Sequence, residues 1–156
     1  MFLFDLIILC HIIDAGHLKV NKGRSSVMKE ENKKRLVVTV EDSDDIQNLY
    51  RSFFEDCLDK KVIQIRSKNH LNSFLDNFNK FDQVEFIVLD GYLSKDDLSE
   101  NSLDFIQPLK NKTEAVLIAA TSDPVMRKKM IEKGVDQQVR NKHELINEEK
   151  LNSLLN

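Results

Sequence analysis

Apolar positions along the chain follow two alternating patterns from residue 35 onward. Short, mostly apolar runs predict strands at residues 36–40, 62–65, 84–89, 115–120 and 135–139. After each run, apolar side chains recur three and four positions apart, as they do on one face of an α-helix. This alternation of strand and helix predicts an α/β fold, a doubly wound five-stranded parallel sheet with helices on both faces.

Capping residues mark the ends of two predicted helices. Asp123 followed by Pro124 predicts a helix start, because the carboxylate can accept from free N–H groups and proline has no N–H to leave unpaired. Gly134 predicts the end of the same helix. At the first helix, Ser43, Asp44 and Asp45 supply capping chemistry, and Asp44 and Asp45 are expected to be the caps at its positive dipole end.

The first 33 residues differ from the rest of the chain. Residues 1–13 are apolar except for Asp5 and His11, but a membrane span needs about 20 residues. A polar leader that begins at Met28 then precedes the first strand. We interpret residues 1–33 as an N-terminal extension, either disordered or translated from an early start, with a signal peptide or anchor as the alternative. Residues 34–156 are expected to form one domain.

Composition narrows the class of function. Of the 156 residues, 41% are hydrophobic and 31% charged, which fits one compact domain with its own core. The net charge is −3, and lysines and arginines are scattered among acids, so we expect no nucleic-acid partner. We also expect no membrane contact for the folded domain. Cys10 and Cys57 are too few for a disulfide framework, which favours a reducing, cytoplasmic location.

Polar side chains follow four of the predicted strands. They are Glu41 and Asp42, Asp90, Thr121, and Asn141 or Lys142. Because parallel strands end at one edge of the sheet, where ligands of such folds bind, these side chains are expected to converge.

The predicted cluster suits phosphoryl chemistry. Three carboxylates brought together repel one another unless a cation lies among them, and Mg²⁺ prefers such oxygen ligands. With Mg²⁺ holding two oxygens of a phosphoryl group, an oxygen of Asp90 could attack phosphorus in line. Thr121 and Lys142 could bind the remaining phosphoryl oxygens.

Four segments resemble a known family in order and separation. They are VTVEDSDDI at 38–46, IVLD at 87–90, LIAATS at 117–122 and GVD at 134–136. Over residues 34–155 the chain resembles the receiver domain of bacterial two-component response regulators, of the stand-alone, single-domain type. The resemblance implies a flavodoxin-like fold. It also implies a phosphorelay, in which a sensor histidine kinase or histidine phosphotransfer protein donates a phosphoryl group to Asp90.

Further roles follow from the same resemblance. Glu41 and Asp42 match the acidic pair that holds Mg²⁺ together with Asp90, and the backbone carbonyl of Tyr92 matches the third protein ligand. Thr121 matches the switch hydroxyl. The resemblance implies signalling to a downstream protein target and slow self-dephosphorylation. It does not imply catalysis of an external reaction.

The chain also departs from the family pattern. Family members usually carry Lys-Pro after the fifth strand, whereas strict spacing puts Asn141 at the Lys position, with Lys142 and His143 following. We assign the lysine role to Lys142. Val139 replaces the usual aromatic residue before that lysine, which argues against coupling through an aromatic rotamer. The loop after Asp90 is longer than usual.

Two other functions remain open at this point. One is a phosphorylation-independent pseudo-receiver, which would follow if Asn141 held the lysine position and Ala119 or Ala120 the threonine position. The other is a Mg²⁺-dependent phosphohydrolase. It would need an additional acid, supplied by Asp96 or Asp97 when the loop closes.

Overall fold

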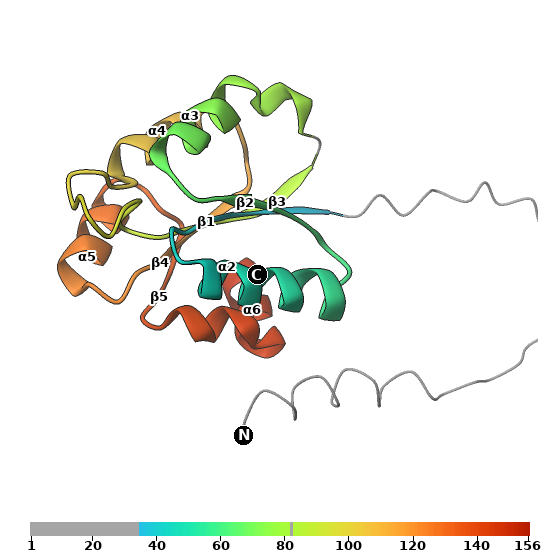
Figure 1. The fold of residues 1–156 in the computed structure, drawn as a ribbon. Coiled ribbons are helices and arrows are strands. Elements are labelled where there is room, and N and C mark those ends of the chain that lie inside the picture. The colour runs from blue at the N-terminus through green and yellow to red at the C-terminus, as the bar shows by residue number, and fades with distance from the viewer. Residues whose placement is uncertain (1–34, 82) are drawn as a thin grey trace, which may run out of the picture. The chain divides into compact units, whose positions relative to one another are not determined.

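The described part of the chain is an α/β sandwich built on a parallel sheet. The structure, a computed structural model, describes residues 35–81 and 83–156, so the expected extension of residues 1–33 lies outside the described residues. The strands form one parallel sheet in the order β2-β1-β3-β4-β5 (Figure 1). Their bounds are β1 Leu36–Val40, β2 Lys61–Ile65, β3 Val84–Leu89, β4 Val116–Ala120 and β5 Gln137–Val139.

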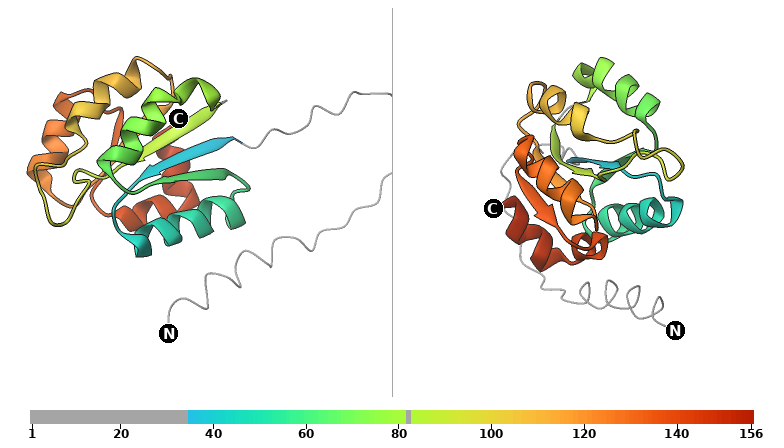
Figure 2. Two further views of the ribbon diagram at one scale, coloured as in Figure 1. Left: turned by 45° about the horizontal axis from the view of Figure 1, so that its top comes forward. Right: turned by 90° about the vertical axis from the view of Figure 1, so that its left-hand side faces the viewer.

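Helices cover both faces of the sheet (Figures 1 and 2). On one face lie α2 Asp44–Arg51, its π-helical continuation η1 Ser52–Cys57, the 3₁₀ turn η3 Lys142–Ile146, and α6 Glu148–Leu155. On the other face lie α3 Lys68–Asp76, the 3₁₀ turn η2 Phe78–Lys80, α4 Leu103–Lys110 and α5 Pro124–Glu132. The predicted fold class, a flavodoxin-like doubly wound sheet, is confirmed. No helix in the described ranges is long and apolar enough to cross a membrane.

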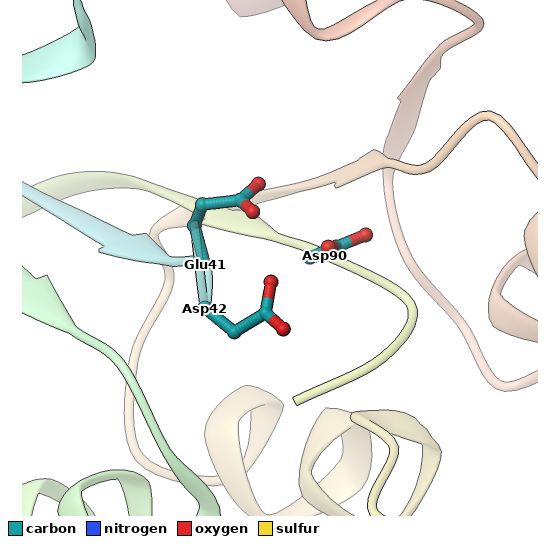
Figure 3. Close-up of side chains that lie close together, drawn as sticks. All are labelled: Glu41, Asp42 and Asp90. Atoms are coloured by element: carbon teal, nitrogen blue, oxygen red, sulfur yellow. The ribbon is translucent and has the colours of Figure 1, made fainter. Parts of the chain in front are cut away.

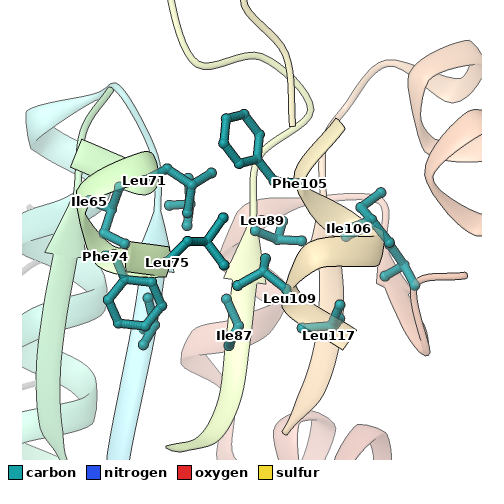
Figure 4. Packing of buried hydrophobic residues seen from close by; sticks show 14 of the residues in the cluster. Ile65, Leu71, Phe74, Leu75, Ile87, Leu89, Phe105, Ile106, Leu109 and Leu117 are labelled. Carbon is teal, nitrogen blue, oxygen red and sulfur yellow. The ribbon is translucent and has the colours of Figure 1, made fainter. Parts of the chain in front are cut away.

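The central strands are mostly apolar because both of their faces are buried, with Thr39 in β1 and Glu85 in β3 as polar members. In β3, Phe86 and Val88 pack into the layer formed with α2 and α6. Ile87 and Leu89 point the other way, into the layer formed with α3, α4 and α5 (Figure 4). All four side chains are at most 1% exposed. A strand buried on both faces reads as a continuous apolar run, which is why its bounds could be predicted from the sequence.

Strand register determines which residues meet at the carboxyl edge. Val40 of β1 pairs with Leu89 of β3, so the residues that follow them leave the sheet side by side. The N–H of Asp90 donates to the carbonyl of Val40 at 2.9 Å, which continues this register for one more residue. Leu89 in turn pairs with Ala119. The sheet therefore brings the ends of β1, β3 and β4 together.

The predicted caps are present at α5 but not at α2. Asp123 Oδ1 accepts from the N–H groups of Val125 at 2.8 Å and Met126 at 3.2 Å, and Gly134 has a φ of 100°, so both predicted ends of α5 are confirmed. The prediction that Asp44 and Asp45 cap the first helix was wrong, because both lie inside its first turn. The cap position belongs to the preceding serine, whose side chain makes no capping hydrogen bond.

Strand β5 is shorter than predicted. It begins at Gln137, because Val135 still makes a backbone hydrogen bond to α5. The N–H of Val135 donates to the carbonyl of Met130, and the N–H of Asp136 donates to the carbonyl of Leu117. The turn η3 that follows β5 was not predicted from the sequence.

Candidate functional site

Three carboxylates converge at the carboxyl edge of the sheet. Glu41 and Asp42 follow β1, Asp90 follows β3, and each offers an oxygen within 4.8 Å of the others (Figure 3). Glu41 is 2% exposed and Asp90 8%, whereas Asp42 is half-buried. Buried carboxylates this close to one another need a cation or protons to offset their repulsion. The convergence expected from the sequence is therefore present in the structure.

Lys142 supplies a cation to two of these carboxylates. Its Nζ lies 2.6 Å from Glu41 Oε2 and 2.6 Å from Asp90 Oδ2. The other oxygen of Asp90, Oδ1, accepts from the N–H of Gly91 at 2.7 Å. The side chain of Asn141 is used differently. Its Oδ1 accepts from the N–H of His143 at 3.0 Å and thereby caps η3.

Burial sets the protonation behaviour of the cluster. Burial first, and then the charge of Asp90, raises the pKa of Glu41 to about 6. Burial also raises the pKa of Asp90, although Lys142 opposes this shift. For Lys142, burial lowers the pKa, but Asp90 and Glu41 outweigh it and the net shift is upward. The Lys142 ammonium therefore stays charged. Its single positive charge does not offset the cost of burying the charges of Glu41 and Asp90, whose pKa values stay raised.

Thr121 lies next to the backbone that follows Asp90. It is 3% exposed, at the end of β4. A Cβ added to Gly91 would lie 3.1 Å from Thr121 Oγ1 and 2.4 Å from Cγ of Met126. The carbonyl of Thr121 accepts from Nη1 of Arg127 at 2.8 Å, which ties the end of β4 to α5. Only glycine at position 91 allows this close approach.

Tyr92 begins the loop that follows the site and lines the pocket. The loop that it begins is closed at its base by hydrogen bonds from the N–H of Leu93 to the carbonyl of Glu100, 2.8 Å, and from the N–H of Ser102 to the carbonyl of Gly91, 3.1 Å. Among the described residues, no hydrogen bond uses the Tyr92 carbonyl. Its hydroxyl donates to Asp123 Oδ2 at 2.7 Å.

An open pocket of about 470 Å³ lies over these groups. Its lining includes Glu41, Asp42, Asp90, Tyr92, Ser94, Lys95, Leu98, Thr121, Ser122, Asp123 and Lys142. Neither Asp96 nor Asp97 is part of this lining. Both are exposed, and their N–H groups donate to Ser94 Oγ at 3.2 Å within the loop. The two aspartates considered as the additional acid of a phosphohydrolase therefore lie outside the pocket lining.

Two buried polar residues at this edge were missed by sequence reasoning. The Nε2 of Gln47 donates to the carbonyls of Thr39, Glu41 and Ile65 at 3.1, 3.0 and 2.9 Å. Ser102 Oγ donates to the carbonyl of Asp90 at 2.7 Å. Both side chains are 0% exposed. For Gln47 a signal existed, since it is a polar residue three positions before a tyrosine on the apolar stripe of the first helix. For Ser102, inside a polar loop, there was none.

Comparison with known proteins identifies the fold. No protein-family model matches the sequence, and no curated protein matches it. Solved structures do match. One is a signal receiver domain of a putative Luxo repressor protein from Vibrio parahaemolyticus, 21% identical, with a TM-score of 0.57 over 78% of this chain and 90% of that one. Another is a signal receiver domain from Clostridium thermocellum, 16% identical, with a TM-score of 0.59 over 78% and 97%.

A third match is a Burkholderia pseudomallei response regulator. Its structure contains a phosphorylated aspartic acid, a calcium ion and citrate. It is 18% identical with a TM-score of 0.55, and the match covers 67% of this chain but only 58% of that protein. The described chain is thus a doubly wound α/β protein with the flavodoxin-like topology. Within that class, its fold is the one seen in receiver domains of response regulators.

Proposed function

We propose that residues 34–156 form a receiver domain in which Asp90 accepts a phosphoryl group from a phosphohistidine donor. The observation that carries the proposal is the environment of Asp90. Its carboxylate has the Lys142 ammonium 2.6 Å away and two further carboxylates within 4.8 Å. A nucleophilic carboxylate that lies next to a cation and to further acidic ligands suits phosphoryl transfer.

The proposed step is a single displacement at phosphorus. An oxygen of Asp90 forms a bond to phosphorus while the P–N bond to the donor imidazole breaks, and the electron pair stays on the imidazole nitrogen. The product is an acyl phosphate on Asp90. The ammonium of Lys142 and the hydroxyl of Thr121 receive phosphoryl oxygens, so the negative charge that develops there is met from two sides.

The residues present fit a divalent metal ion. Glu41, Asp42 and Asp90 offer hard oxygen atoms from one cluster, and the Tyr92 carbonyl is not used by any hydrogen bond among the described residues. We propose that these four groups hold Mg²⁺, which prefers such ligands. When bound, the ion would neutralise charge on the transferring phosphoryl group.

The remaining parts of the proposal concern partners. A sensor histidine kinase or a histidine phosphotransfer protein in the cytoplasm would be the donor. Phosphorylation would change the affinity of this domain for a downstream protein target. Water would slowly remove the phosphoryl group from Asp90, and no external substrate would be turned over.

The test is phosphorylation of the full chain by acetyl phosphate with Mg²⁺, followed by intact-mass measurement. We expect the mass of one phosphoryl group to be added to the unsubstituted protein. Asp90→Asn should gain none, and Asp104→Asn, which changes an exposed aspartate on α4, should behave as the unsubstituted protein. No addition to the folded protein would reject this proposal in favour of a pseudo-receiver. Steady hydrolysis of a phosphate ester would favour the phosphohydrolase.

A further inference from the structure

A buried tyrosine on α2 contacts the backbone of Lys142 at the start of η3, in the same helical layer. The hydroxyl of Tyr50, on α2, donates to the backbone carbonyl of Lys142 at 3.2 Å, across 92 positions in the sequence. Tyr50 is 0% exposed. A buried tyrosine hydroxyl needs a partner, and here that partner is the residue whose ammonium contacts Asp90.

The ring of Tyr50 is fixed by aromatic packing. It stacks on Phe54 with centroids 5.8 Å apart and planes 25° apart. Phe54 in turn meets Phe86 of β3 edge-on, at 5.4 Å. Phe54 and Phe86 are also 0% exposed. The hydroxyl therefore projects from a rigid part of the core, because close-packed aromatic side chains have little freedom to move.

The chain around Lys142 is held on its other side by a capping box. Glu144 Oε1 accepts from the N–H groups of Arg140 at 3.0 Å and Asn141 at 2.8 Å, while Asn141 Oδ1 accepts from the N–H of His143. These bonds fix the turn but use none of the backbone of Lys142 itself. The carbonyl of Lys142 is held by Tyr50.

We propose that Tyr50 is a positioning residue for Lys142, a role that rests on the proposed function of Lys142 as the phosphoryl-binding cation. A lysine side chain is long and flexible, so where its ammonium comes to rest depends on where its backbone is held. A root displaced by a fraction of an ångström would draw Nζ away from Glu41 and Asp90. Such misplacement costs rate even when the fold is intact.

The hydroxyl of Tyr50 keeps its proton at neutral pH. Burial first, then the charges of Glu41 and Asp90, raise the pKa of Tyr50 above its ordinary value. The Tyr50 hydroxyl therefore stays a donor to the Lys142 carbonyl.

Tyr50→Phe tests the proposal, since it removes the hydroxyl and keeps the ring. In the full chain with acetyl phosphate and Mg²⁺, we expect phosphorylation of Asp90 to slow roughly five-fold, the factor one neutral hydrogen bond contributes. In a Lys142→Ala background, Tyr50→Phe should cause no further loss. Leu154→Ala is the control, because it removes buried apolar contacts from the same layer near the start of β4, at the end of the sheet away from the site. It should leave the rate unchanged.

Two results would overturn the proposal. One is an unchanged rate for Tyr50→Phe, and the other is a loss of equal size with and without Lys142, which would show that Tyr50 acts only on the fold. A second readout does not depend on phosphorylation. The N–H protons of the Lys142 ammonium, observed through their ¹⁵N resonance, should exchange slowly with solvent in the unsubstituted protein. In Tyr50→Phe they should exchange faster. If the unsubstituted protein takes no phosphoryl group, the proposed function fails, and this resonance still decides the role of Tyr50.

Discussion

Glu41→Gln is expected to stabilise the metal-free domain at neutral pH, although it removes a proposed metal ligand. Burial and Asp90 raise the pKa of Glu41 from 4.5 to about 6. The folded state therefore binds the proton more tightly than the unfolded state, and stability falls as pH rises from 4.5 through 6. Each pKa unit corresponds to about 1.4 kcal/mol, so the ionised Glu41 destabilises the fold by about 2 kcal/mol above pH 6.

Glutamine removes this charge at nearly constant shape. Its Oε1 can still accept from the N–H of Ser43, as Glu41 Oε1 does at 3.1 Å. The interaction with Lys142 becomes weaker, so the gain at pH 7.5 should be at most about 2 kcal/mol. Near pH 4 the gain should vanish, because Glu41 is then protonated in the folded state.

Urea denaturation with EDTA at pH 7.5 and pH 4 measures the effect as a change in the free energy of unfolding. Glu114→Gln, at an exposed glutamate before β4, is the matched control and should be neutral at both pH values. A Glu41→Gln protein that is less stable at pH 7.5, or equally stabilised at pH 4, would refute the reasoning about burial.

Three further outcomes are expected. Lys142→Ala should lower the free energy of unfolding by about 3 kcal/mol at pH 7.5 in EDTA, because it leaves two buried carboxylates without their cation; urea denaturation measures this, and an unchanged midpoint would contradict it. Gly91→Ala should cost about 1 to 3 kcal/mol by forcing a Cβ against Met126, and a thermal melt that matches the unsubstituted protein would speak against the close contact. Tyr92→Phe breaks the hydrogen bond to Asp123 at the pocket rim. Loss of the phosphoryl group from Asp90, followed by intact mass, should then be roughly five-fold faster, and an equal or slower loss would exclude a role for this bond in limiting access of water.

The sequence predicted the fold well where burial alone determines structure. The bounds of β1 and β3 matched, because strands buried on both faces are mostly apolar and so differ from the polar residues that flank them. Prediction was weaker where tertiary contacts decide. Strand β5 begins only at Gln137 because the N–H of Val135 instead donates to the carbonyl of Met130 in α5, and nothing in the local pattern shows this bond.

At the candidate site, residues that directly follow strands could also be predicted, whereas contacts that depend on tertiary structure could not. Residues that follow strands could be inferred, because register brings Glu41 beside Asp90 without any knowledge of side chains. Lys142 was assigned the lysine role although strict family spacing favoured Asn141, and the local pattern does not show how η3 begins, which sets the position of both side chains. Gln47, Ser102 and Tyr50 all donate to backbone carbonyls outside their own helices, and side-chain type does not reveal such contacts.

The loop after Asp90 is held at its base by backbone hydrogen bonds. Because the Leu93–Glu100 and Ser102–Gly91 hydrogen bonds hold both of its ends, residues 94–99 project from a fixed base. This segment carries Leu98, which is 65% exposed beside the pocket. Under the proposed function, an exchange of residues 94–99 would change the surface that a donor protein meets, while backbone hydrogen bonds still hold both ends of the loop.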